Sequence, residues 1–128
     1  MRREQTFSRK EHLRRGADFD RAFQCGRRAS DTLLTVYVIE NGLGYSRLGR
    51  SVGRRVGNAV ARNRVRRRLA EAFRRNKARL SLGTDFVCVV KPAAAEPGTD
   101  LAASMIELAA RAAGRRSTPG PDCKDQTS

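Results

Sequence analysis

The chain has 128 residues, which fits one domain, and a formal net charge of +14, with 27 Lys or Arg against 13 Asp or Glu. So strong a positive charge predicts a polyanionic partner, with nucleic acid favoured over an anionic membrane surface. Its longest apolar run, Phe86–Val90, is too short for a membrane-spanning helix, and the first twelve residues lack the apolar core of a secretory signal. Cys25, Cys88 and Cys123 are widely spaced and the chain has a single histidine, which argues against a zinc site and predicts free thiols in a reducing, cytoplasmic setting.

The amino-terminal part predicts an arm followed by a short helix. Residues 1–12 are polar and charged, which is typical of a mobile basic arm. The stretch ADFDRAFQC, residues 17–25, places Phe19 and Phe23 one turn apart on one face, and a glycine follows it. This pattern predicts a helix with Asp18 as its N-cap.

Two strands are predicted next. Residues 33–39, LLTVYVI, are rich in β-branched and aromatic side chains. Asn41 and Gly42 then form the dipeptide that is typical of a tight turn, and the chain returns through residues 47–53. The pattern predicts an antiparallel hairpin.

The most basic segment predicts a helix over residues 58–80, with Asn58 as its N-cap. Helical spacing places Val65, Leu69 and Phe73 together on one face, where they would meet the core. The opposite face collects Asn63, Ala70 and three arginines, Arg66, Arg67 and Arg74.

The rest of the chain supplies one more strand and one more helix. Residues 85–91, DFVCVVK, form a nearly continuous apolar run, which predicts a central strand buried on both faces. An alanine-rich helix is expected over 99–113, and the Gly, Pro, Ser and charged residues of 114–128 predict a disordered tail. The predicted domain therefore spans residues 13–113.

The arginines carry the chemical signal. Residues 54–79 hold eleven basic residues and one acid, Glu71. An ordinary solvated helix face mixes both signs, so that interpretation leaves most of these arginines unexplained. The planar fork of arginine matches two phosphate oxygens, and Asn63 can both donate and accept toward a phosphate, a 2′-hydroxyl or a base edge.

The aromatic residues allow two interpretations. Phe19, Phe23 and Tyr37 could stack on single-stranded bases, or they could be core residues, which the spacing of the two phenylalanines favours. Catalytic motifs are weak, since no Ser/His/Asp group stands out and Asp18 and Asp20 fit the start of a helix better than an acid–base pair.

One long stretch, GRSVGRRVGNAVARNRVRRRLAEAF, resembles the signature of the bacterial ribonuclease P protein component. That family has a G-x-S-V strand, a Gly-Asn-Ala-Val turn and an Arg-Asn-x-x-[Lys/Arg]-Arg helix. The stretches DFDRAF, TVYVI and DFVCVVKPAA fall where the family has its first helix, its leader-facing strand and its last central strand. The resemblance covers about residues 13–113.

The resemblance implies a single-domain α+β fold in the order αβββαβα, with a four-stranded sheet and the basic helix as its crossover. It also implies a short first strand near residues 27–31, which the periodicity did not indicate.

The resemblance further implies the protein subunit of an endoribonuclease whose catalysis belongs to a large RNA, with magnesium held mainly by that RNA. The enzyme hydrolyses a phosphodiester to remove the 5′ leader of precursor tRNA. The implied partners are the catalytic RNA and precursor tRNA, with neither membrane nor duplex DNA. The catalytic RNA would meet Arg55, Asn58, Arg62, Asn63, Arg66 and Arg67, and the leader would meet Phe19, Phe23 and Tyr37.

The sequence departs from the family pattern at three positions. Arg50 stands where the family usually has an apolar residue, Ala70 replaces an arginine, and Arg66 replaces a lysine.

Two other functions would also account for the positive charge. A ribosomal protein or RNA chaperone would share it, and so would a DNA-binding protein, which should favour duplex DNA over structured RNA.

Overall fold

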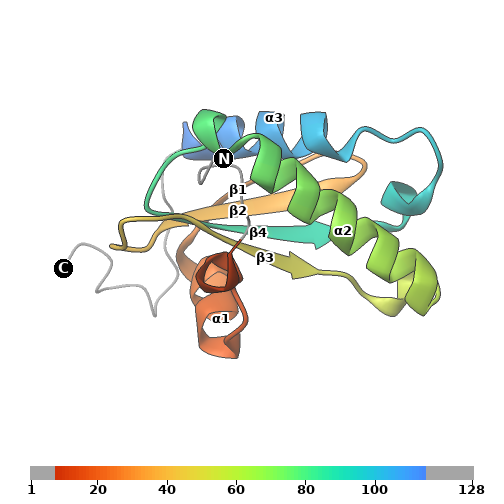
Figure 1. Cartoon of the computed structure of the whole chain (residues 1–128), viewed down its shortest axis with the longest axis horizontal. Coiled ribbons are helices and arrows are strands. Elements are labelled where there is room, and N and C mark those ends of the chain that lie inside the picture. The colour runs from red at the N-terminus through yellow and green to blue at the C-terminus, as the bar shows by residue number, and fades with distance from the viewer. Residues whose placement is uncertain (1–7, 115–128) are drawn as a thin grey trace.

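The computed structural model describes residues 8–114, which fold around one four-stranded sheet. The elements follow the predicted order αβββαβα (Figure 1). They are α1 (Gly16–Cys25), β1 (Arg27–Ser30), β2 (Leu34–Glu40), β3 (Arg47–Ser51), α2 (Ala59–Arg75), β4 (Thr84–Val90) and α3 (Leu101–Ala113).

The strands lie in the order β1-β2-β4-β3. β1 pairs antiparallel with β2, and β2 with β4, whereas β3 and β4 are parallel. A parallel pair needs a long connection, and α2 supplies it. The strand expected near residues 27–31 is β1, and β4 is the central buried strand that its apolar run predicted.

The predicted hairpin is wrong. β2 and β3 are not neighbours, because β4 lies between them. The Asn41–Gly42 turn exists, with Gly42 at φ 72°, but Asn41 bonds to β4 rather than closing a tight hairpin. Its backbone N–H donates to the Gly83 carbonyl at 2.9 Å, and its side chain donates to Asp85 at 2.9 Å.

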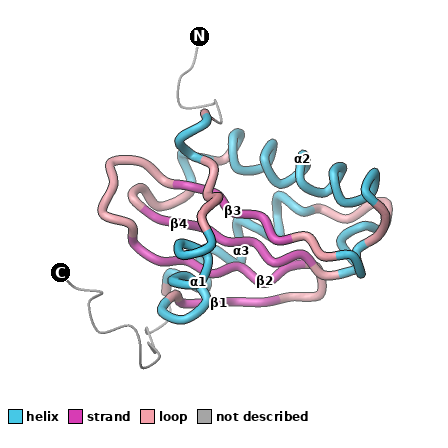
Figure 2. The backbone as a smooth tube through the Cα atoms, turned by 90° about the horizontal axis from the view of Figure 1, so that it is seen from below, coloured by secondary structure: helices cyan, strands magenta, loops and turns pink. Residues whose placement is uncertain are grey.

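Helices cover both faces of the sheet: α2 and α3 lie on one side and α1 on the other (Figures 1 and 2). The larger core fills the space under α2 and α3, where the rings of Phe73 and Phe86 lie 6.3 Å apart. Val65, Leu69 and Phe73 are buried there, as their spacing predicted. A smaller cluster under α1 includes Ala22 and Val87.

α2 ends earlier than predicted, at Arg75 rather than near residue 80. The Asn76 side chain donates to the Ala72 carbonyl at 2.8 Å, and its backbone N–H bonds to the carbonyls of Ala72 and Phe73. These bonds satisfy the end of the helix, and a 3-10 turn at Lys77–Arg79 follows.

The predicted arm also needs correction. Residues 8–12 form a capped 3-10 turn and a bridge to β3, and Glu11 is buried in an ion pair with Lys77 at 2.5 Å. Residues 1–7 of the arm and 115–128 of the tail lie outside the described residues. α1 begins at Gly16 with Arg15 at the N-cap, so Asp18 is not the cap.

The cysteine prediction is also wrong in part. Cys25 is disulfide-bonded. Cys88 is the free thiol of the described part of the chain, and burial raises its pKa to about 12. Spacing along the chain does not report which side chains meet in space.

None of the helices within residues 8–114 has the length and apolar content to cross a membrane.

Candidate nucleic-acid interface

The basic surface is built on the amino-terminal half of α2. Asn58 caps the helix by accepting from the Ala61 backbone N–H at 2.9 Å. Gly57 enters the turn with φ 153°, and a Cβ there would lie 2.9 Å from the Ala61 side chain. Only glycine fits this position, so the chain turns sharply and presents the helix start to solvent.

The predicted contact residues gather along this surface. Asn63, Arg64 and Arg67 are exposed, whereas Arg62 and Arg66 are half-buried on the flank that faces β3. Arg55 and Asn58 are exposed just before the helix. The structure therefore brings together on one side of the sheet Arg55, Asn58, Arg62, Asn63, Arg66 and Arg67.

Acidic side chains do not neutralise this surface. Glu71 is the acid of α2, and Arg74 and Arg75 both hydrogen-bond to it, which lowers its pKa to about 2. Within residues 8–114, no Asp or Glu forms an ion pair with Arg62 or Arg67. A surface of this kind attracts phosphate groups through charge and through the geometry of the guanidinium fork.

The aromatic residues lie together on the other face of the sheet. The Phe23 ring is 6.2 Å from that of Phe19 and 5.0 Å from that of Tyr37, to which it lies edge-on. Phe23 is 42% exposed, and Phe19 and Tyr37 are half-buried. The two phenylalanines therefore differ in exposure: Phe19 packs closely over Gly49, whereas Phe23 leaves part of its ring open to solvent.

A buried ion cluster, which the sequence did not indicate, positions α1 over the sheet. The Asp85 carboxylate is fully buried, and Arg47 binds it through two bonds of 2.8 and 2.7 Å. Arg47 also lies 3.6 Å from Asp18 of α1, and Arg21 donates to the Glu40 carbonyl at 2.6 Å. These bonds fix the helix that carries Phe19 and Phe23.

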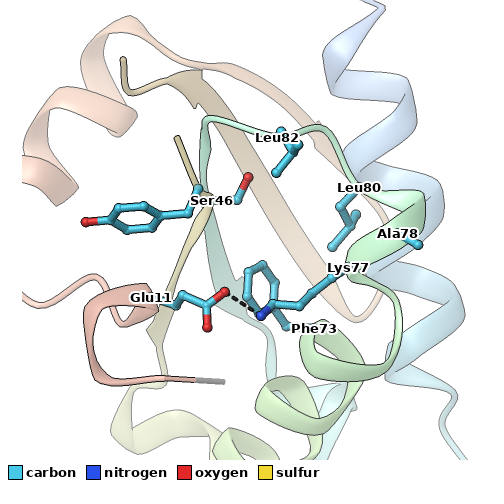
Figure 3. Close-up of a pocket in the computed structure, with 8 residues that line it drawn as sticks. Glu11, Ser46, Phe73, Lys77, Ala78, Leu80 and Leu82 are labelled. Atoms are coloured by element: carbon cyan, nitrogen blue, oxygen red, sulfur yellow. Dashed lines mark ion pairs between the residues drawn. The ribbon is translucent and has the colours of Figure 1, made fainter. Parts of the chain in front are cut away.

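Glu11 of the amino-terminal segment lies beside the carboxyl-terminal end of α2, where it pairs with Lys77 (Figure 3). A cavity of about 540 Å³ lies there, between Tyr45 and Leu80, and the Glu11–Lys77 ion pair borders it. Its lining is mostly apolar and includes none of the predicted contact residues.

The comparison with known proteins supports one family. The ribonuclease P family model matches residues 7–113. The ribonuclease P protein component of Syntrophus aciditrophicus is 37% identical over 86 residues, which cover 67% of this chain and 72% of the relative. That of Petrotoga mobilis is 39% identical over 85 residues, or 66% of this chain and 72% of the relative.

Solved structures agree with this family. The RNase P protein of Thermotoga maritima is 34% identical and matches with a TM-score of 0.65, over 76% of this chain and 89% of that protein. The RNase P protein of Staphylococcus aureus is 25% identical with a TM-score of 0.66, over 80% and 92% of the two chains.

Proposed function

Since the chain belongs to the ribonuclease P protein component family, we propose that it binds the catalytic RNA of ribonuclease P through α2 and holds the 5′ leader of precursor tRNA against the aromatic face of the sheet. The RNA subunit carries out the phosphodiester hydrolysis. The protein thereby assists the endonucleolytic step that produces the mature 5′ end.

One observation carries this proposal: exposed arginines and partly exposed aromatic side chains lie on opposite faces of one sheet. The arginines of α2 suit a structured RNA backbone, because they offer many phosphate contacts without acidic neighbours. The exposed face of Phe23 beside Tyr37 suits a single-stranded segment, because unpaired bases stack on aromatic rings. A protein that only coats RNA has no need of the second surface.

Magnesium would be held mainly by the RNA. Within residues 8–114, no three His, Cys, Asp or Glu side chains come together as metal ligands. The buried Asp85 carboxylate is engaged by Arg47 and Asn41 instead. The chain's own part in the reaction is to neutralise phosphates and to orient the leader.

Reconstitution tests the proposal. The protein, the catalytic RNA and a precursor tRNA are combined at low magnesium, and release of the 5′ leader is measured. The expected result is cleavage that depends on the protein and that duplex DNA does not abolish in competition. Cleavage at the same rate without the protein, or preferential binding of duplex DNA, would contradict the proposal.

A further inference from the structure

The cavity beside the carboxyl-terminal end of α2 belongs to neither of the binding surfaces described above (Figure 3). Its volume is about 540 Å³, and its walls come from the amino-terminal segment, the turn before β3 and the chain between α2 and β4. Most of the lining is apolar, contributed by Tyr45, Phe73, Ala78, Leu80 and Leu82. An apolar cavity of about 150 Å³ already accommodates benzene. This cavity therefore has room for an aromatic side chain.

The mouth of the cavity exposes apolar surface. Leu82, which lines the cavity, is 78% exposed. Leu43 is 38% exposed, and its carbonyl group lies against Gly83, the residue after Leu82. Exposed apolar surface that continues into a cavity is typical of a site that another apolar group covers. The occupant expected here is thus apolar, in contrast to the phosphate groups that the arginines of α2 attract.

The described part of the chain begins at this cavity. The Ser8 backbone N–H donates to the Glu11 carboxylate at 2.7 Å, and Glu11 lines the cavity and pairs with Lys77. Residue 7 is bonded to that same nitrogen, and adjacent Cα atoms lie only about 3.8 Å apart. Residue 7 is a phenylalanine, and the ribonuclease P family model begins its match there. An aromatic side chain is therefore tethered one residue away from a group that is hydrogen-bonded to the cavity wall.

We propose that the ring of Phe7 occupies this cavity and anchors the amino-terminal end of the chain to the carboxyl-terminal end of α2. The ring packs against Phe73 and Leu80 and shields the Glu11–Lys77 ion pair from water. A tethered group has a high effective concentration at its site, so no second molecule is needed. A second copy of the chain is disfavoured as the occupant, since two molecules of net charge +14 repel each other.

Nuclear magnetic resonance of the full chain tests the contact directly, and it needs no RNA, so its result does not depend on the proposed function. We expect nuclear Overhauser contacts between the Phe7 ring and the methyl groups of Leu80 and Ala78. These contacts should vanish in Phe7→Ala. The ring of Phe23, which lies on α1 at the other face of the sheet, serves as the control and should show none. A Phe7 ring without contacts to either methyl group would overturn the proposal.

Thermal unfolding measures what the anchor contributes. Phe7→Ala should lower the melting temperature by roughly 5 °C or more, because the apolar contacts of the ring are lost. Phe7→Leu keeps an apolar side chain and should lose less. Gln5→Ala is the matched control from the same stretch of chain and should melt like the natural protein. If Phe7→Ala melts at the same temperature as Gln5→Ala, the ring stabilises nothing and the anchor is wrong.

Sedimentation at increasing protein concentration tests a second copy as the occupant. We expect the natural protein to remain a monomer. The comparison variant is Leu82→Ser, which removes the exposed leucine at the mouth of the cavity. A dimer that Leu82→Ser abolishes and that Phe7→Ala retains would place a second copy on the cavity and overturn the proposal.

Discussion

Asn63 and Arg67 lie one turn apart on the exposed side of α2, where neither supports the core. Replacing either with alanine should therefore weaken binding of the catalytic RNA and leave the fold intact. Each lost charge-assisted hydrogen bond should cost roughly 1.5–3 kcal/mol of binding free energy. Affinity is measured by titration, with circular dichroism as the check on folding and Arg111→Ala as the control. Unchanged affinity in both variants would refute the RNA contact.

Phe19 and Phe23 should behave differently, although one turn separates them. Phe23 is 42% exposed, so Phe23→Ala should reduce the preference for precursor over mature tRNA by roughly 1–3 kcal/mol, the value of one stacked base. Phe19 packs over Gly49 and against the buried cluster that includes Leu13, so Phe19→Ala should mainly lower the free energy of unfolding, by about 2 kcal/mol. Both quantities are measured on each variant. A stability loss alone for Phe23→Ala would make it a core residue.

At the scale of the elements, the ion cluster at Asp85 holds α1 in place. Asp85→Ala removes the fully buried carboxylate that Arg47 binds through two bonds and leaves Arg47 only its looser contact with Asp18, which should cost about 3–5 kcal/mol of stability. Asp18→Ala removes only a looser contact of 3.6 Å, so its cost should stay near or below about 1 kcal/mol. Urea denaturation of the two variants measures the difference. Equal losses of stability in the two variants would show that the buried Asp85 carboxylate contributes no more to the cluster than Asp18 does.

The amino-terminal segment should loosen at acid pH. Burial raises the pKa of Glu11, but the ion pair with Lys77 and two hydrogen bonds from Ser8 outweigh it, so the pKa lies below 4.5. A lowered pKa in the folded state means that Glu11 stabilises the protein above about pH 4.5, and that this contribution is lost as pH falls through the lower value. Unfolding free energies of the natural protein and Glu11→Gln should therefore converge toward acid pH. A constant difference between them would contradict this assignment.

The sequence predicted those features that depend on local spacing. The 3.6-residue period placed Val65, Leu69 and Phe73 in the core, and the apolar run at 85–91 predicted a central strand. It failed at the hairpin, because insertion of β4 between β2 and β3 is a long-range pairing that Asn41–Gly42 does not encode. The placement of Arg50 under α2 depends on packing in the same way.

At the scale of the whole molecule, the two proposed binding surfaces share one scaffold. α2 packs on one face of the sheet and α1 on the other, so β3 and β4 lie between the arginines of α2 and the aromatic residues on the α1 side. A chain of +14 must fold against its own repulsion. The ion pairs at Asp85 and Glu11 lie away from the exposed arginines of α2, so they leave the charge of that surface in place.

This distribution of charge predicts that the isolated protein is only marginally folded at low salt and that multivalent anions complete its folding. An anion that binds the native state at about 100 times its Kd adds roughly 2.7 kcal/mol of stability. That value is a large share of the 5–15 kcal/mol typical of a domain, and about the whole of a weak one. Sulfate or pyrophosphate should raise helicity by circular dichroism well beyond chloride at equal ionic strength. Equal ionic strength is the necessary control, because screening alone relieves repulsion between surface charges. If chloride matches sulfate, screening explains the effect without specific sites. If the protein at low salt is already fully helical and unfolds cooperatively at high temperature, its hydrophobic core outweighs the repulsion and the premise of marginal stability is wrong.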